Sequence, residues 1–489
     1  MVKQWLRLGI LFLLPWVIAA SSLRDETLRS AIVKVYTVVK NPDYTMPWSS
    51  SIQQISGSGS IIEGHRILTN AHVVANRTFI EVQRYGERKR YIAHVEAVSH
   101  QLDLALLKVD DPSFFEGIEP LKLGKLPQIE QKVSVYGFPM GGDTLSVTAG
   151  VVSRIEHQRY VHSGESFLAI QIDAAVNPGN SGGPAISDGK IVGVVMEGIS
   201  KAQNISYLVP TIMIRHFLKD LQDGKLDGVP AFPVLTQPME NPTLKAAYHL
   251  SSQEGGVLVD KVLKEGGLQK LLKVGDVITA IDGHPIQEDA TVDFRQHEYT
   301  NYEYYVQLHQ MGEKVGLDIL RNGKKIHLEA PLLKKADQLL LIGTYHYDRM
   351  PRYFILGGYV FSPLTRNLAV RVARSHISLI PYVEDFVTPK RKEVVLLLRV
   401  LPSALSRGDY DYAYWAVEKV NGKKVVDFAD FYRQVTQSNC AQILLQNKMG
   451  TRILIDRREA MKYQKEILQR YNIEYGSSPD LRVMKNKGK

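Results

Sequence analysis

The sequence predicts a mainly β protein of about three domains, and three observations carry this prediction. The chain has 489 residues, which is enough for about three domains of ordinary size. From residue 31 to residue 210, short alternating β-branched segments are separated by Gly and Pro, which is typical of barrels or sandwiches. After residue 224, a pattern of two strands and a tight turn occurs twice, which indicates two copies of one small domain.

The elements of the first part can be placed in order. Strands are expected in four segments: 31–39, 61–62, 132–136 and 190–196. A helix is expected from Thr211 to Gly224, because Ile214, Phe217 and Leu221 fall at helical spacing and Gly224 ends the pattern.

In the second part, Asp282-Gly283 and Asn421-Gly422 are strong hairpin turns, because both pairs tolerate positive φ. Residues 457–473 are expected to form a helix, and the polar, basic tail from Gly476 is expected to be disordered. The chain has one cysteine, Cys440, so no intrachain disulfide can form, and its apolar neighbours indicate a buried, inert thiol.

The composition excludes collagen-like, low-complexity and wholly disordered chains, since 44% of the residues are hydrophobic and 23% are charged. The formal charge of +9 is spread along the chain. The densest basic patches, residues 88–90 and 390–392, each lie beside a glutamate, Glu87 or Glu393. Solvated loops therefore explain them better than a nucleic-acid or membrane site.

The N-terminus has the pattern of a signal peptide over residues 1–22. Lys3 and Arg7 precede an apolar stretch at 8–20, and the small residues 19–22 follow it. An uncleaved anchor is the alternative, but 13 apolar residues fall short of the ~20 that span a bilayer. We therefore expect cleavage, a mature charge of +7 (two positive charges fewer than +9), and an exported protein without stable membrane insertion.

Three motifs carry candidate chemistry. Ser181 stands in the run Gly179-Asn180-Ser181-Gly182-Gly183, where glycines permit a tight turn and the amides of Gly179 and Ser181 can converge on an oxyanion. His72 follows a predicted strand and supplies an imidazole, the usual general base near neutral pH. Asp103 supplies a carboxylate inside the apolar strand 102–107, where burial is costly unless the group is paired. The alternatives are an ordinary turn, a core histidine and a turn-capping aspartate.

Taken together, the segments Thr69–Val74, Asp103–Leu107 and Gly179–Pro184 resemble those of the Deg/HtrA serine proteases, in the chymotrypsin-like order His, Asp, Ser. The resemblance covers about residues 28–460. Residues 45–48 and 238–241 are similar to the plant-type members with long PDZ tandems.

The resemblance implies a chymotrypsin-like double β-barrel followed by two PDZ (α+β) domains. The implied division is a protease domain at 28–222, PDZ domains at 228–335 and 345–460, and a helix with a basic tail at 461–489. Ser181 would be the nucleophile, His72 the base and Asp103 its orienting group, with the amides of Gly179 and Ser181 as oxyanion hole. An apolar S1 pocket is implied at Ala175, Val176 and Ile205. Residues 154–167, with Arg159, resemble the sensor loop of the family, and an ordinary exposed hairpin is the alternative.

The implied function is ATP-independent cleavage of unfolded or misfolded proteins. The chain contains no zinc-protease or phosphate-loop motif, and we expect no cofactor and no metal. The resemblance further implies a periplasmic location and a homo-oligomer built on trimers through aromatic residues such as Tyr44 and Trp48. A chaperone or PDZ scaffold with an idle protease is the rival. Of the two PDZ domains, the second has the more complete glycine loop, at 356–360, and is expected to be the better peptide binder.

Overall fold

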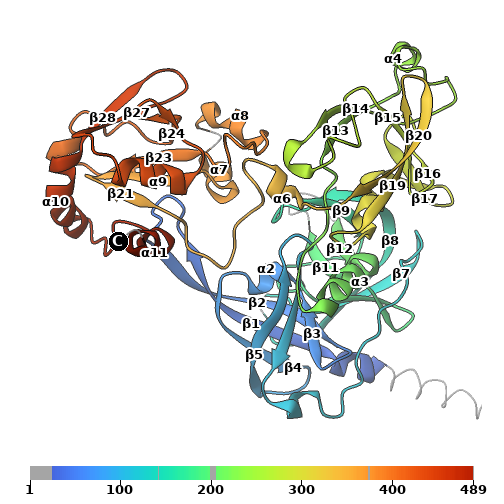
Figure 1. Ribbon diagram of the computed structural model, residues 1–489. Helices are drawn as coiled ribbons and strands as arrows, with labels where there is room; N and C mark the ends of the chain where they lie inside the picture. The colour runs from blue at the N-terminus through green and yellow to red at the C-terminus, as the bar shows by residue number, and fades with distance from the viewer. Residues whose placement is uncertain (1–24, 141, 199–204, 373–374, 488–489) are drawn as a thin grey trace, which may run out of the picture. The chain divides into compact units, whose positions relative to one another are not determined.

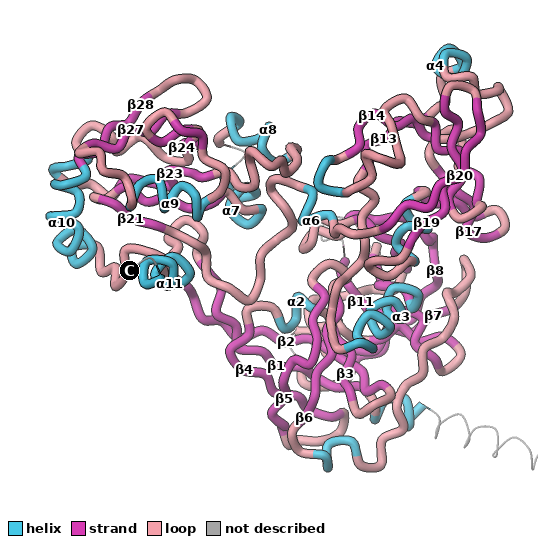
Figure 2. Tube along the Cα trace, in the orientation of Figure 1, coloured by secondary structure: helices cyan, strands magenta, loops and turns pink. Residues whose placement is uncertain are grey.

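The computed structural model describes residues 25–140, 142–198, 205–372 and 375–487 (Figure 1). The expected signal peptide at 1–22 lies outside the described residues. The chain divides into two compact units, which are treated separately. The first comprises residues up to 39, 53–228 and 299–304, and the second comprises 40–52, 229–298 and 305–489. Strands make up most of the regular structure of the first unit (Figure 2), so the mainly β fold is confirmed.

The first six strands close into a barrel in the order β1-β2-β3-β6-β5-β4. They are β1 (Ile32–Pro42), β2 (Ser50–Ile62), β3 (Arg66–Thr69), β4 (Arg77–Arg84), β5 (Arg90–Ser99) and β6 (Leu104–Val109). The apolar run at the start of β6 is completely buried in this barrel. A short helix, α2 (Ala71–Val74), follows β3 and connects it to β4.

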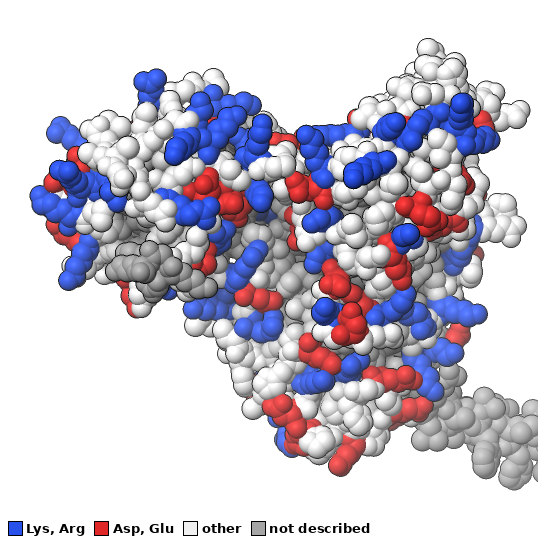
Figure 3. All heavy atoms as spheres, in the orientation of Figure 1, with Lys and Arg blue, Asp and Glu red and all other residues white. Residues whose placement is uncertain are grey.

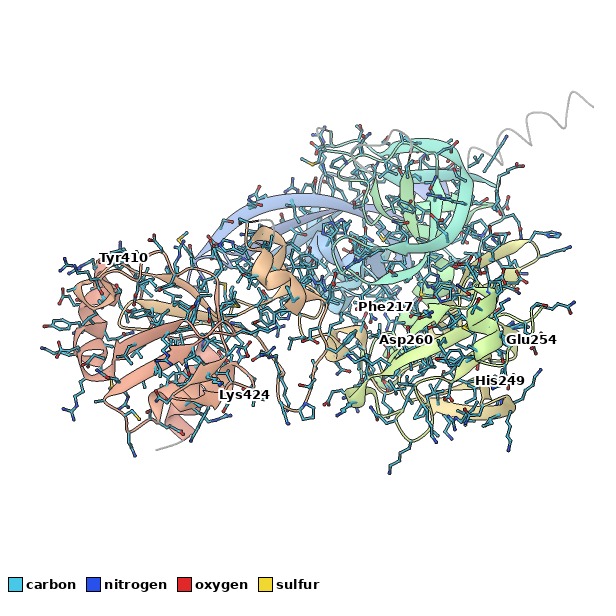
Figure 4. All side chains as sticks on the ribbon, turned by 90° about the horizontal axis from the view of Figure 1, so that it is seen from above. Phe217, His249, Glu254, Asp260, Tyr410 and Lys424 are labelled. Atoms are coloured by element: carbon cyan, nitrogen blue, oxygen red, sulfur yellow. The ribbon has the colours of Figure 1, made fainter. Side chains whose placement is uncertain are left out.

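The next six strands close into a second barrel in the order β10-β11-β12-β9-β8-β7. They are β7 (Lys132–Gly137), β8 (Ser146–Arg159), β9 (Ser166–Ile172), β10 (Pro184–Ser187), β11 (Lys190–Gly198) and β12 (Ser206–Pro210). The predicted helix follows as α3 (Thr211–Asp220). A single 3-10 turn (Leu221–Asp223) continues it and ends at Gly224, whose φ of 81° only glycine adopts readily. Phe217 of α3, labelled in Figure 4, is 1% exposed.

The second unit contains two α+β domains. The main sheet of the first has the order β13-β14-β15-β19-β20, with β16 paired to β15, and β17 and β18 form a separate ribbon. The strands are β13 (Val234–Pro238), β14 (Val257–Val262), β15 (Val277–Ile281), β16 (His284–Pro285), β17 (Thr291–Arg295), β18 (Glu298–Asn301), β19 (Lys314–Arg321) and β20 (Lys324–Pro331). The helices are α4 (Pro242–Ala247) and α5 (Glu303–Leu308). Residues 299–304, in β18 and the first turn of α5, belong to the first unit. The predicted turn joins β15 to β16, with φ of 48° at Asp282 and 78° at Gly283.

The second α+β domain has two four-stranded sheets, in the orders β21-β22-β23-β24 and β26-β25-β27-β28. The strands are β21 (Phe354–Leu356), β22 (Tyr359–Pro363), β23 (Val395–Val400), β24 (Trp415–Val417), β25 (Lys419–Val420), β26 (Lys423–Lys424), β27 (Gln442–Gln446) and β28 (Arg452–Asp456). The helices are α6 (Ala336–Leu339), which precedes the sheets, α7 (Arg366–Val372), α8 (Ile380–Val383), α9 (Phe428–Thr436), α10 (Arg457–Arg470) and α11 (Pro479–Lys487). Asn421 and Gly422 form the second predicted turn.

Two expectations about the C-terminal region were wrong. Cys440 is exposed, because it lies in the turn before β27 rather than in the strand, and its backbone N–H donates to the Ser438 hydroxyl at 3.1 Å. The tail from Gly476 is not disordered over the described residues. It forms α11, and Leu481 is fully buried in the domain core.

The two aromatic residues expected at a trimer contact pack within the second unit. Tyr44 is 5% exposed, and its hydroxyl donates to the His346 carbonyl at 3.1 Å. The ring of Trp48 makes an edge contact with Tyr353 at 6.0 Å between centroids. Neither residue is therefore a free aromatic surface in this chain. Across the described part of the chain, no helix has the length and apolar character that a membrane span requires.

Candidate active site

A buried carboxylate and an imidazole form the centre of the site in the first barrel. The Nδ1 atom of His72 lies 2.8 Å from Oδ2 and 3.0 Å from Oδ1 of Asp103. The backbone N–H of His72 also donates to Oδ1, at 2.9 Å. Asp103 is 1% exposed, so these N–H groups replace the water that its carboxylate loses on folding. The contact fixes the orientation of the ring, with Nδ1 toward Asp103 and Nε2 on the opposite side.

Asp103 is held by its backbone as well as its side chain. It lies in the turn that precedes β6, with a left-handed φ of 55°, and not inside an extended strand as expected. A left-handed residue interrupts the strand geometry, and Asp tolerates this conformation better than most residues. The side-chain amide of the fully buried Asn70 donates to the Asp103 carbonyl at 2.8 Å and fixes the turn.

The loop that carries Ser181 depends on glycine at two positions. Gly179 has a φ of 100° and Gly182 a φ of 84°, both in the region that favours glycine. A Cβ at Gly182 would lie 2.2 Å from the Ser58 carbonyl, and one at Gly179 would lie 2.5 Å from the Phe138 carbonyl. Any larger residue at either position would therefore displace the loop.

Ser58 of β2 fastens this loop to the first barrel. Its backbone N–H donates to the Ser181 carbonyl at 2.8 Å, and its buried hydroxyl donates to the Gly179 carbonyl at 2.7 Å. The same hydroxyl accepts the N–H of Phe138 at 2.8 Å. Sequence reasoning missed Ser58. The run of small residues at 57–60 in an otherwise bulky strand is the signal that points to a close backbone approach.

The Ser181 hydroxyl is directed to the Met196 carbonyl, at 3.5 Å. That separation is long for a hydroxyl donor, so the contact holds the hydroxyl only weakly. The structure thus brings His72 and Asp103 together, and it places Ser181 on a loop that is fixed to the first barrel.

Two aromatic side chains from the β8–β9 hairpin cover the imidazole, and sequence reasoning missed this arrangement. The hydroxyl of Tyr160 lies 3.2 Å from Nδ1 of His72, and Tyr160 is fully buried. The ring of His162 stacks on that of His72, with 5.2 Å between centroids and 9° between planes. Arg159, expected to be a sensor, donates within the hairpin to the Gly164 carbonyl at 3.1 Å.

Burial is the main cause that lowers the pKa of His162, and the neighbouring charge of His72 lowers it further. Tyr160 follows the end of β8 and His162 lies in the turn of the hairpin, where no strand alternation indicates which side chains share a face.

Of the three residues expected to line the S1 pocket, Ala175 and Val176 are adjacent in the chain and Ile205 belongs to a later segment. Ala175 and Val176 are on the segment that leads to Ser181, where Ala175 is exposed and Val176 is half-buried. Ile205, also half-buried, immediately precedes β12. The Ser206 hydroxyl donates to the Ala174 carbonyl at 3.1 Å, which places the start of β12 beside this segment.

The described residues contain no group of three His, Cys, Asp or Glu side chains arranged to hold a metal ion. On the face drawn in Figure 3, acidic side chains are interspersed among basic ones over the first unit. This distribution differs from the single-sign stripe that follows a nucleic-acid backbone.

Family models match three parts of the chain: a trypsin-like peptidase domain at residues 57–194, and PDZ domains at 247–332 and 342–480. The putative mitochondrial protease Do-like 3 of Arabidopsis thaliana is 36% identical over 473 residues, which cover 94% of this chain and 81% of the relative. The chloroplastic protease Do-like 2 of the same plant is 37% identical over 411 residues, covering 82% and 67%. The solved HtrA-type protease AlgW with a tripeptide is similar at 26% identity and a TM-score of 0.50, over 63% of this chain and 94% of that one.

The stacked histidines predict a specific titration behaviour. His162 should titrate below its ordinary pKa near 6.5, because burial and the His72 charge both disfavour its protonated form. Replacing the neighbour, as His72→Ala, should raise the pKa of His162 while leaving it below 6.5, since burial is the larger cause. NMR of histidine ring carbons over a pH series measures this.

His327 is the control for that titration, because contacts with Asp318 and Glu329 raise its pKa in the second unit, and His72→Ala should leave it unchanged. A His162 that titrates above 6.5 in the unmodified chain would contradict the stacked arrangement.

Proposed function

The chain belongs to the Deg/HtrA family of Do-like serine proteases, and on that premise we propose that it is an ATP-independent endopeptidase that degrades unfolded or misfolded proteins. The observation that carries the proposal is the buried contact between Asp103 and His72 beside the glycine-bounded loop of Ser181. The proposed domains are a protease at 28–222 and PDZ domains at 228–335 and 345–460.

The proposed mechanism follows from the site geometry. The Ser181 hydroxyl attacks the peptide carbonyl while His72 takes its proton at Nε2 and later delivers that proton to the leaving amine. Asp103 accepts the Nδ1–H and stabilises the imidazolium that forms. The amides of Gly179 and Ser181 stabilise the oxyanion, which develops only as the reaction proceeds.

The rival function is a chaperone or PDZ scaffold with an idle protease, and two contacts favour it. The Ser181 hydroxyl is directed to Met196, and the His162 ring covers one face of the His72 imidazole. Both contacts also fit a resting enzyme, in which the hydroxyl turns and the hairpin moves when substrate binds. Purified chain that suppresses aggregation of unfolded casein without cutting it would favour the rival.

Unfolded polypeptides are the proposed partners, and no nucleic acid is expected. The AlgW structure contains a tripeptide, which supports peptide binding by this chain as a proposal. A homo-oligomer built on trimers remains proposed from family resemblance alone, because Tyr44 is buried within its own chain. Mass measurement of the purified chain in solution tests the trimer.

We propose that the chain works in an exported or organellar compartment, reached after removal of residues 1–22. The relatives are named mitochondrial and chloroplastic proteases, which supports organelle import more than the periplasm expected from the sequence. Expression of the complete chain with a fluorescent C-terminal fusion tests the location.

Replacing the proposed nucleophile gives the direct activity prediction. Ser181→Ala should reduce turnover of unfolded casein by several orders of magnitude, because the triad members act as a unit. His72→Ala should cost about as much, since a serine hydroxyl without its base is nearly inert. Initial rates on fluorescent casein measure both.

Ser153→Ala is the matched control, because Ser153 is an exposed serine of the same barrel. It should leave casein turnover unchanged. Near-normal turnover by Ser181→Ala would refute the assignment of the nucleophile.

The proposed S1 pocket predicts the cleavage preference. Ala175, Val176 and Ile205 carry no charge, so the chain should cut after Val, Ala, Ile or Leu and not after Lys or Arg. The preference should be broad, because apolar pockets discriminate by only about 1–3 kcal/mol per methylene. Cleavage sites in casein mapped by mass spectrometry measure it, and a dominant Lys, Arg, Asp or Glu before the cut would exclude this pocket.

A further inference from the structure

The second PDZ domain has no open sheet edge at its glycine loop. PDZ domains bind a C-terminal peptide as an added strand beside the strand that follows a glycine-containing loop. Here that strand is β22, which follows Gly357 and Gly358. It is paired on one side with β23 and on the other with β21. Within the described residues of the first PDZ domain, the corresponding strand β13 ends its sheet. The outer edge of β21 is therefore where a further strand can be added to the second domain.

The outward backbone groups of β21 are already bonded to the C-terminal segment of the same chain. The N–H of Ile355 donates to the Gly476 carbonyl at 2.7 Å, and the N–H of Ser478 donates to the Tyr353 carbonyl at 2.9 Å. Phe354 and Ser477 form an antiparallel bridge. Along an antiparallel strand, every second residue directs its N–H and C=O groups toward the same neighbour. Tyr353 and Ile355 bond to the C-terminal segment in this way, so the segment is placed as an added strand would be.

Gln464 of α10 binds the two outward groups that the segment does not reach. Its Nε2 donates to the Ile355 carbonyl at 2.8 Å, and its Oε1 accepts the N–H of Gly357 at 2.9 Å. The Gly357 amide belongs to the glycine loop, where a peptide carboxylate would be received. The Oε1 atom of Gln464 therefore occupies a position that would suit an oxygen of a peptide carboxylate.

The rest of the C-terminal region anchors this arrangement. Ala460 and Leu481 are fully buried in the domain core. Helix α10 approaches so closely that a Cβ at Gly357, whose φ is 58°, would lie 2.7 Å from the Cβ of Ala460. The PDZ family match extends to residue 480, 20 residues past the boundary expected at 460. The segment is thus part of the domain.

We infer that the occupant of this sheet edge is the chain's own segment Tyr475–Ser478 together with Gln464, and that the edge is closed to a free C-terminal peptide. This reverses the expectation that the second PDZ domain is the better peptide binder. A peptide can bind there only after the segment leaves, so its apparent affinity falls by the fraction of open molecules. The inference does not use the catalytic residues, so it can fail independently of the proposed protease activity.

Hydrogen–deuterium exchange on the complete chain tests this inference, with Ser181→Ala in the background to prevent cleavage. The probe is a decapeptide ending in Ala-Leu-Val with a free carboxylate, and its amidated form is the comparison. We expect residues 353–361 to be protected without peptide and to gain no protection when peptide is added. Protection of 353–361 by the free-acid peptide, but not by the amidated one, would overturn the inference.

Gln464→Ala tests the closure directly, and Gln469→Ala, an exposed glutamine of the same helix, is the matched control. Removing two hydrogen bonds should accelerate exchange of the Gly357 amide about tenfold or more, and should strengthen peptide binding at 353–361 by a similar factor. The control variant should change neither quantity. An unchanged exchange rate of the Gly357 amide in Gln464→Ala would contradict the role of Gln464. If this variant folds poorly, the peptide-protection experiment on the chain with Gln464 intact still tests the inference.

Discussion

The site depends on one buried carboxylate. Removing the Asp103 side chain from water costs several kcal/mol unless donors replace that water. Two N–H groups of His72 provide the replacement, and this requires the helix α2 and the turn before β6 to meet at hydrogen-bond distance. The left-handed backbone at Asp103 and the amide of Asn70 fix that turn. The same contact that stabilises the carboxylate therefore sets the direction of the imidazole.

The glycine loop adds the second constraint, which is steric. Gly179 and Gly182 have backbone conformations that other residues adopt only with strain, and their surroundings leave no room for a Cβ. Ser58 of the first barrel bonds to this loop at two points and to the Phe138 N–H of the second barrel at a third, which connects the two barrels at the site. The loop of Ser181, which precedes β10 of the second barrel, is thereby bonded to the barrel that carries His72 and Asp103.

Patterns that repeat along the chain could be predicted, and contacts between distant segments could not. Strand periodicity predicted the mainly β fold, helical spacing predicted α3, and glycine turns predicted the hairpins at Asp282 and Asn421, because these patterns depend on neighbouring residues. The contacts of Tyr160 and His162 with His72 depend on how the β8–β9 hairpin folds, and that hairpin is distant from His72 in the sequence. The polar tail was expected to be disordered because its few apolar residues, such as Leu481, gain stability only from a core that is built by strands and helices between residues 354 and 460.

The most direct test of the account is the rate at which a serine-reactive phosphonate labels the chain, compared between the parent and Asp103→Asn. If the buried carboxylate orients His72 to activate Ser181, mass spectrometry should find one adduct per chain, on Ser181. Asp103→Asn should then slow labelling by roughly a thousandfold or more, because the neutral amide favours the wrong imidazole tautomer. An adduct on another residue, or equal labelling rates in the two proteins, would contradict the central claim.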